Sequence, residues 1–131
     1  LKEHVKNFLQ NKGYNIKDFG ALEYDSLDDY PDFIIPAAKH IAEHNLIGII
    51  FGGSGQGEAM AANRIKGIRA AVFYNGPNEI VELSRMHNNA NILSIGARFL
   101  SNQEAESIIE LWLSTDFEEG RHEKRINKLD S

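Results

Sequence analysis

The sequence contains no cysteine. This absence excludes disulfide bonds, a thiol nucleophile and the cysteine type of zinc site. The chain also lacks an excess of positive charge, because 14 lysines and arginines stand against 19 acidic residues and give a formal net charge of −5. Nucleic acid is therefore not an expected partner, since binding its phosphates requires a broad basic surface.

Long apolar runs are missing as well. No stretch approaches the roughly 20 apolar residues that a membrane-spanning helix needs, and no secretory signal peptide is recognisable. Internal repeats, low-complexity tracts and interdomain linkers are also absent. The 131 residues, 42% apolar and 25% charged, are typical of a soluble globular protein. We expect a single domain over residues 1–131, located in the cytoplasm and without a membrane partner.

The most informative stretch that is present runs from Ile47 to Gly67. It begins with a β-branched, apolar run over 47–51, which predicts a buried strand. Four glycines follow within 52–57, and glycine can take positive φ at almost no cost. Residues 58–64 then have the composition of a helix. A strand, a glycine loop and a helix N-terminus in this order form an anion-binding arrangement.

Three known loop motifs nearly fit this stretch, and each fails at one position. A phosphate-binding Walker loop needs lysine where Glu58 stands, and the dinucleotide fingerprint needs its third glycine there. A nucleophile elbow centred on Ser54 needs glycine where Gln56 stands. Glu58 is the informative departure, because a carboxylate is unusual in an anion-binding loop. Its spacing alone favours the ordinary interpretation of a solvated acid in the first turn of a helix.

Periodicity and turn residues predict the remaining elements. These are a helix from Leu1 or before to Gly13, a strand over 14–19, a polar loop over 20–29, a helix from Pro31 to His44 with a first turn loosened by Pro36, a strand over 69–74, a helix from Gly76-Pro77 to about His87, a strand over 92–96, a helix opened by a Ser101/Glu104 capping box, and a short charged helix over 121–129.

Helices and strands alternate in this order, which indicates a parallel sheet with right-handed crossovers and helices on both faces. The predicted class is a three-layer α/β fold of the flavodoxin or Rossmann type. Ligands of such sheets bind outside the carboxyl ends of the strands. The loop 52–58, the region of Asn75 and the turn after Gly96 should therefore lie together.

A possible metal motif occurs at the end of the second helix. His40 and His44, with Glu43 between them, match the H-x-x-E-H pattern of one class of zinc peptidase. No third ligand is evident, and polar residues are common on the outer face of a crossover helix. The sequence therefore favours solvated side chains here, and we expect no metal and no cofactor.

Together the motifs resemble those of the type B ribose-5-phosphate isomerases and the related galactose-6-phosphate isomerase subunits, over nearly the whole chain. The segments that carry the resemblance are Asp29-Tyr30-Pro31-Asp32, the run from Phe51 to Glu58 with Ala61-Ala62-Asn63, Lys66-Gly67-Ile68-Arg69-Ala70, the run from Ser84 to Asn91, Gly96-Ala97-Arg98, and Glu119-Gly120-Arg121-His122. The resemblance implies an aldose–ketose isomerase of sugar phosphates that works through a cis-enediolate.

The resemblance also implies roles for individual residues. One branch of the family has a cysteine base at the place of Gly52, whereas the other has glycine there and a glutamate base at the place of Glu58. This chain resembles the second branch. Ser54 and the loop amides would hold the enediolate oxygen, His87 would open the sugar ring, and Asn88 would contact the sugar oxygens.

Substrate binding is implied for further residues. Tyr30 would line the pocket, and Gly53 and Gly57 would contact the substrate. The phosphate would be held by Arg98, Arg121 and Arg125. Forked guanidinium groups suit a phosphate, although two arginines one turn apart on a terminal helix are more often a solvated face. The same holds for His87, which at a helix C-terminus could simply complement the dipole.

Three further expectations follow from the resemblance. The family builds its site across a dimer interface, so a homodimer or a dimer of dimers is expected, and the second subunit would supply some of these groups. Members carry a strand and an Asp-His-Ala-Gly turn before the helix that here starts at Leu1; this chain begins after them, and no residue is assigned to their roles. The preferred substrate is ribose 5-phosphate, and the alternatives are galactose or allose 6-phosphate, or a sugar-phosphate-binding domain without catalysis.

Overall fold

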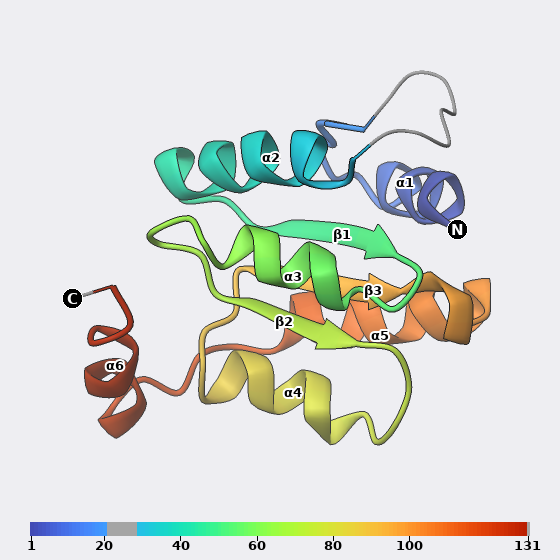
Figure 1. Cartoon of the computed structure of the whole chain (residues 1–131). Coiled ribbons are helices and arrows are strands. Elements are labelled where there is room, and N and C mark those ends of the chain that lie inside the picture. Colours follow the sequence, from blue (N-terminus) through green and yellow to red (C-terminus); the bar gives the residue numbers. More distant parts are fainter. Residues whose placement is uncertain (21–28, 131) are drawn as a thin grey trace.

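The computed structural model describes residues 1–20 and 29–130. Its elements in chain order are α1 (Lys2–Asn11), α2 (Pro31–His44), β1 (Gly48–Gly52), α3 (Gln56–Ala62), β2 (Ala70–Phe73), α4 (Glu79–Met86), β3 (Ile92–Gly96), the short 3-10 helix η1 (Ala97–Phe99), α5 (Asn102–Ser114) and α6 (Arg121–Ile126). Figure 1 shows their arrangement. None of the helices in these ranges combines the length and apolar character needed to cross a membrane.

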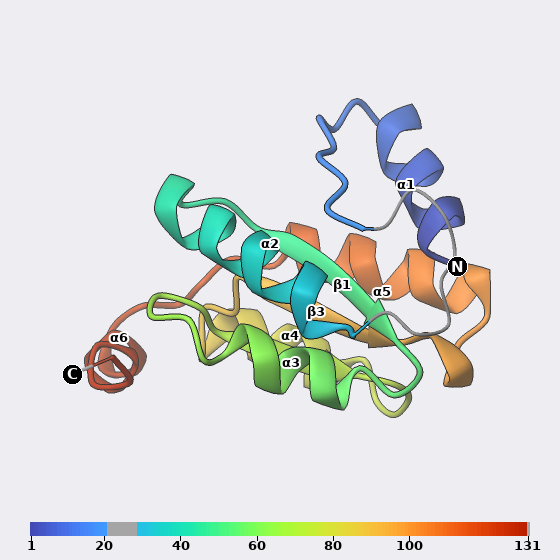
Figure 2. The ribbon, with the colours of Figure 1, turned by 45° about the horizontal axis from the view of Figure 1, so that its top comes forward.

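The three described strands form one parallel sheet in the order β1-β3-β2. Ile92 at the start of β3 stands opposite Gly48 on one side and Ala70 on the other. The central strand β3 is buried along its whole length, as its continuous apolar run predicts, and its bounds agree with the prediction. All three strands run in one direction, so their carboxyl ends lie at the same edge of the sheet (Figure 1, Figure 2).

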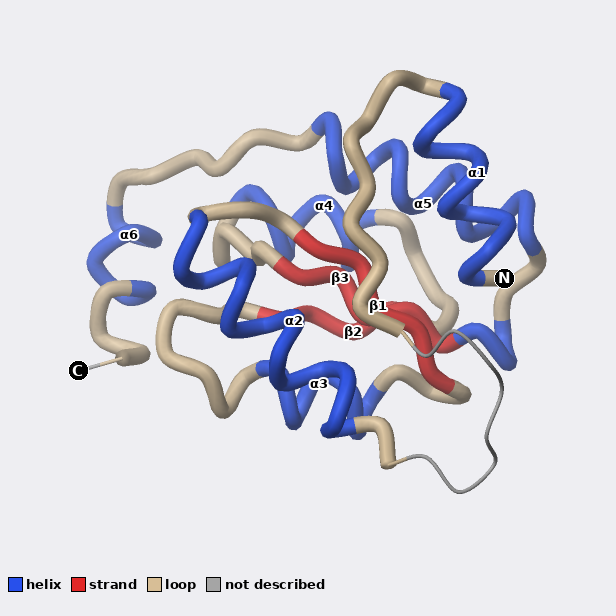
Figure 3. The backbone as a smooth tube through the Cα atoms, turned by 90° about the horizontal axis from the view of Figure 1, so that it is seen from above, coloured by secondary structure: helices blue, strands red, loops and turns tan. Residues whose placement is uncertain are grey.

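Helices cover both faces of the sheet, which confirms the predicted three-layer architecture (Figure 3). Helices α2 and α3 pack on one face through a cluster that includes Ala38, Ile41 and Ile92. Helices α1, α4 and α5 pack on the other face, where the buried side chains include Trp112 and Ile109. Burying each large apolar side chain stabilises the fold by about 1.5 to 3 kcal/mol.

Residues 14–19 were predicted as a strand, and this prediction is wrong. The segment is extended but belongs to no described strand ladder. It is held by other contacts: Tyr14 N–H donates to Leu9 C=O at 3.1 Å, and the Asp18 carboxylate binds the Lys2 ammonium at 2.8 Å. Alternation of apolar residues predicts a face to bury, whereas a strand also requires a neighbouring backbone within hydrogen-bonding reach.

Several helix boundaries also differ from the predictions. Helix α2, by contrast, has the predicted bounds, and its range includes Pro36, which has no N–H to donate within the helix. Helix α4 begins at Glu79, after the predicted Gly76-Pro77 start, and α6 ends at Ile126 and not at Leu129. The Ser101/Glu104 capping box is confirmed, with both reciprocal hydrogen bonds present. The polar loop predicted over 20–29 lies almost wholly outside the described residues.

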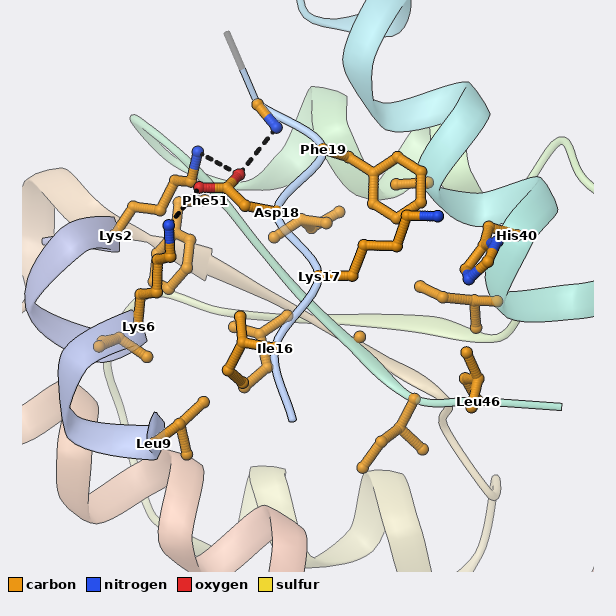
Figure 4. Close-up of a pocket in the computed structure, with 18 of the residues that line it drawn as sticks. Lys2, Lys6, Leu9, Ile16, Lys17, Asp18, Phe19, His40, Leu46 and Phe51 are labelled. Carbon is orange, nitrogen blue, oxygen red and sulfur yellow. Dashed lines mark hydrogen bonds and ion pairs between the residues drawn. The ribbon is translucent and has the colours of Figure 1, made fainter. Parts of the chain in front are cut away.

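A cavity of about 790 Å³ runs along the outer edge of β1, which has no partner strand within the described residues. Its lining is mainly apolar and comes from α1, residues 14–20, α2 and β1 (Figure 4). The apolar lining includes Val5, Leu9, Ile16, Phe19, Phe33, Ile34, Ile41, Ile49 and Phe51. Glu58 and Tyr30 also line it. Within the described residues, the backbone N–H and C=O groups on this edge of β1 are not paired with another strand.

Candidate active site

The glycine loop joins the carboxyl end of β1 to the start of α3. Helix α3 begins at Gln56, two residues before its predicted start, because Gly55 at φ 78° caps it. A side chain at Gly55 would collide with β3, where Ser94 Oγ donates to Gly55 C=O at 2.6 Å. Only glycine suits this position, since it requires both positive φ and close approach of the backbone. The loop is thereby held against the end of the central strand.

Glu58 lies in the first turn of α3, facing the end of β1. Its carboxyl group occupies the space that a Cβ atom on Gly52 would need. The side chain is half-buried and borders the cavity beside β1. The first N–H groups of a helix have no partner within the helix, so this place favours a carboxylate and any developing oxyanion nearby. Ser54 Oγ accepts from Gln56 N–H at 3.3 Å, which leaves its own O–H free to donate.

Two more predicted substrate contacts lie over the same loop. The Arg98 guanidinium lies 3.0 Å from the Cβ position of Gly53, and Arg98 N–H donates to Gly53 C=O at 3.1 Å. The Tyr30 hydroxyl lies 2.7 Å from the Cβ position of Gly57. The loop glycines therefore leave room for a phenol and a guanidinium to approach. The described structure brings these groups together with Ser54 and Glu58 at the carboxyl edge of the sheet.

The other predicted site residues lie at the opposite edge. His87 is the C-terminal cap of α4, which runs against the strand direction, and Asn88 follows it. Arg121 and Arg125 are exposed on α6. Figures 1 and 2 both show α6 beyond the amino ends of the strands. A strand of five residues spans about 16 Å, so one chain keeps these groups well away from Glu58.

His87 has two neighbours that the sequence analysis did not select. The imidazoles of His87 and His122 stack with their centroids 4.2 Å apart and their planes 10° apart. The Glu118 carboxylate lies 3.8 Å from Nε2 of each ring. His122 is the last residue of the Glu119-Gly120-Arg121-His122 motif, and Glu118 directly precedes that motif. This position in the sequence was the signal that could have identified them as site residues. The contact between α4 and the segment before α6 joins residues that are distant in the sequence, so no local sequence pattern predicts it.

Electrostatics distinguish the two histidines. Burial lowers the pKa of His122, and the positive charges of His87 and Arg121 lower that pKa further. Its surroundings therefore favour the neutral imidazole. Its side chain is only 9% exposed, compared with 37% for His87, so His87 is the imidazole that a ligand can reach.

Among the described residues, this cluster is the group of side chains that comes nearest to a metal site. The two imidazole nitrogens and the carboxylate oxygen lie within 4.8 Å of one another. The rings are nearly parallel, so their in-plane lone pairs lie in two stacked planes and do not converge on one ion. The H-x-x-E-H pair gathers no third ligand within the described ranges, and His44 Nδ1 contacts His40 C=O at 2.9 Å. We propose no metal at either place.

Comparison with known proteins places this arrangement in a family. The family model described as "Ribose/Galactose Isomerase" matches residues 1–129. The chain belongs to this family. A family member from Mycoplasma genitalium, "Probable ribose-5-phosphate isomerase B", is 37% identical over 98% of this chain and 85% of its own length. The "Ribose-5-phosphate isomerase B" of Mycobacterium tuberculosis H37Rv is 39% identical over 98% of this chain and 80% of its own length.

Solved structures of the family agree with the fold. Ribose 5-phosphate isomerase B of Thermotoga maritima superposes with a TM-score of 0.91 at 42% identity, covering 98% of this chain and 88% of that one. The M. genitalium isomerase, solved with bound ribulose-5-phosphate, gives a TM-score of 0.91 at 36% identity, covering 98% and 84%. The resemblance inferred from the sequence motifs and the predicted parallel α/β class are both confirmed.

Proposed function

We propose that this chain is an aldose–ketose isomerase that interconverts ribose 5-phosphate and ribulose 5-phosphate. The placement of Glu58 carries the proposal. It is an acid in the first turn of α3, over a glycine loop at the carboxyl ends of parallel strands, where such sheets bind their ligands. Membership of the ribose/galactose isomerase family supports the reaction class, and a relative that holds ribulose-5-phosphate supports the substrate.

In the proposed reaction, Glu58 removes the proton from C2 of the open-chain aldose and returns it to C1. The intermediate is a cis-enediolate, and its developing negative charge falls on the carbonyl oxygen. The Ser54 hydroxyl and the loop amides, with Gly53 and Gly57 among them, stabilise that oxygen. The hydrogen lost at C2 is regained at C1, and the proton of the C2 hydroxyl is transferred to O1 as the carbonyl moves from C1 to C2. The reaction therefore balances without an external oxidant or reductant. Tyr30 borders the sugar.

The remaining roles are assigned to groups at the opposite edge of the sheet. His87 opens the sugar ring, Asn88 contacts the sugar oxygens, and Arg121 and Arg125 bind the phosphate together with Arg98. Within the described residues, Arg121 and Arg125 have no ion-pair partner, which leaves their donors available to an anion. Because one chain cannot bring both edges together, we propose a homodimer in which each site combines the loop of one subunit with α6 of the other.

Six-carbon sugar phosphates are the alternative substrates. The family description names galactose as well as ribose, so galactose 6-phosphate or allose 6-phosphate remains a candidate substrate. The chemistry at C1 and C2 would be the same, and the difference would lie in the distance between the base and the phosphate site. If the chain turns over none of these substrates, that result would support a sugar-phosphate-binding domain without catalysis. The cytoplasmic location stays a prediction.

A coupled isomerase assay tests the proposed function. Ribose 5-phosphate, galactose 6-phosphate and allose 6-phosphate would be compared as substrates, with Glu58→Gln as the control for contaminating activity. The assay would be run on this chain and on the chain preceded by the strand and Asp-His-Ala-Gly turn of its relatives. We expect the highest kcat/KM for ribose 5-phosphate. A higher kcat/KM for a six-carbon substrate would mean that the enzyme is a hexose-phosphate isomerase. If neither form of the chain shows turnover, the proposed isomerase function is refuted.

A further inference from the structure

The stacked pair of His87 and His122 is attached to its surroundings at several points. Glu118 N–H donates to Met86 C=O at 3.0 Å, directly beside His87 in the chain. Arg85 Nε donates to Thr115 C=O at 3.2 Å, three residues before Glu118. The segment that carries Glu118 is thereby fastened to the end of α4 by one backbone hydrogen bond and by one hydrogen bond from the Arg85 side chain. These contacts do not involve the Glu118 carboxylate, which is free to act on the imidazoles.

The charged groups around the pair come from two segments. Arg85 at the end of α4 is directed elsewhere, since its guanidinium donates to Ala90 C=O and Asn89 Oδ1. Helix α6 contributes Arg121 and Arg125, which both disfavour a positive charge on His122. The segment before α6 contributes Glu118, whose carboxylate faces both imidazoles. Glu118 is therefore the acidic group placed to balance a positive charge on His87, while His122 beneath it stays neutral.

We propose that Glu118 is a positioning residue for His87 in opening the sugar ring, with His122 as the flat support on which the His87 imidazole rests. This proposal rests on the proposed isomerase function and adds two residues to it. The carboxylate lies 3.8 Å from Nε2 and orients the ring by electrostatic attraction while the imidazole carries the transferred proton. The stack restricts rotation of the His87 ring, because a turn about its side-chain bonds would lose the parallel contact.

Proton transfers in ring opening explain why this arrangement matters. As the C1–O4 bond breaks, its electron pair goes to O4, which takes a proton from the His87 imidazolium. The neutral imidazole then takes the proton from O1, and the C1 carbonyl forms. The imidazolium is regenerated, so protons and electrons balance over the step. A carboxylate near the imidazole stabilises the charged form at the beginning and the end of this cycle.

Glu118→Gln tests the proposal, because glutamine keeps the length and backbone contacts of the residue but removes its charge. Ribulose 5-phosphate provides the sharp comparison. Its C5 oxygen carries the phosphate, so it cannot close the furanose ring and needs no ring opening. Two rates would be measured in the form of the chain that is active in the isomerase assay. The first is turnover of ribose 5-phosphate, and the second is deuterium uptake from D₂O at C1 of ribulose 5-phosphate.

We expect Glu118→Gln to lower kcat for ribose 5-phosphate about tenfold, with KM changed less than about twofold. Deuterium uptake into ribulose 5-phosphate should stay within about twofold of the parent, because Glu58 performs it. Glu119→Gln, the same change at the next position, is the matched control and should leave both rates unchanged. A kcat near the parent value overturns the proposal, as does an equal loss of both rates. If the parent protein itself has no isomerase activity, the proposed function is refuted, whatever the Glu118→Gln variant does.

Discussion

The Glu58 carboxyl group lies over Gly52, in the space that any side chain at position 52 would need. The two positions are therefore coupled: a Cβ atom at 52 and a carboxylate at this place exclude each other. The sequence resemblance describes a family with either a cysteine at the first position or a glutamate at the second. Steric exclusion supplies a physical reason for the pairing of glycine with glutamate in this chain.

Substitution of Gly52→Ala should therefore disable the base without removing it. We expect kcat to fall at least about tenfold, because a misplaced base loses its alignment with the substrate. Combining the change with Glu58→Gln provides the control. If Gly52→Ala acts by displacing Glu58, it should lower kcat little further in that background. Additive losses would show that Gly52 matters for another reason.

Glu58→Gln alone should abolish proton transfer while keeping the shape of the side chain. We expect kcat to fall by about a hundredfold or more, the scale of a general base, with a modest change in KM. Deuterium exchange into the sugar at C1 or C2 should disappear with it. Glu79→Gln is the matched control, since Glu79 holds a similar first-turn place in α4. Near-normal turnover in Glu58→Gln would reduce Glu58 to an ordinary first-turn acid.

The arginines of α6 should affect substrate affinity and leave stability nearly unchanged. Arg121→Ala or Arg125→Ala removes a charge-assisted contact to phosphate, so KM for ribose 5-phosphate should rise about tenfold or more. Thermal unfolding should shift little, because both side chains are exposed. Lys124→Ala, on the same helix, is the control for general loss of positive charge. An unchanged KM in either variant would mark that arginine as a solvated charge.

Shared sites predict rescue between inactive chains. His87→Ala and Glu58→Gln disable opposite edges of the sheet, so a mixed dimer would contain one site with both edges intact. Random mixing in equal amounts should restore about a quarter of the parent activity. Mixing Ser54→Ala with Glu58→Gln is the control, since both changes fall on the same edge and no site is restored. No rescue after demonstrated subunit exchange would place all the groups in a single subunit.

Acid should weaken the attachment of residues 14–20 to α1. A hydrogen bond from Lys2 lowers the pKa of Asp18 from 3.8 to about 2, with help from Gly20 N–H and Lys6. The folded state favours the carboxylate, so this stabilisation is complete above the unfolded pKa and is lost as pH falls from about 4 to 2. Asp18→Asn should lower the free energy of unfolding at pH 7 by on the order of 1 to 2 kcal/mol.

Urea unfolding of the parent and Asp18→Asn at several pH values checks this prediction. The difference between the two proteins should shrink through that window and vanish below pH 2. A difference that is independent of pH would show that Asp18 stabilises the segment through packing or turn geometry and not through its charge.

Features with short-range causes were predictable from the sequence. The observed bounds of β3 agree with the prediction because its continuous apolar run is itself the part of the chain that is buried. The predicted capping box is observed because both of its hydrogen bonds join residues only three positions apart. The glycine loop and Glu58 were identifiable for the same reason. The parallel sheet followed from the alternation of elements, since a parallel connection needs a crossover helix.

Only the tertiary structure decided two other matters. Residues 14–19 form no described strand, because pairing depends on which backbone lies beside them and not on their own alternation. His87, Arg121 and Arg125 lie at the opposite edge from Glu58, because α4 runs against the strands and α6 packs at their amino ends. A sequence records which groups are present and how they are spaced along the chain. Their distance in space depends on the direction in which each element is packed.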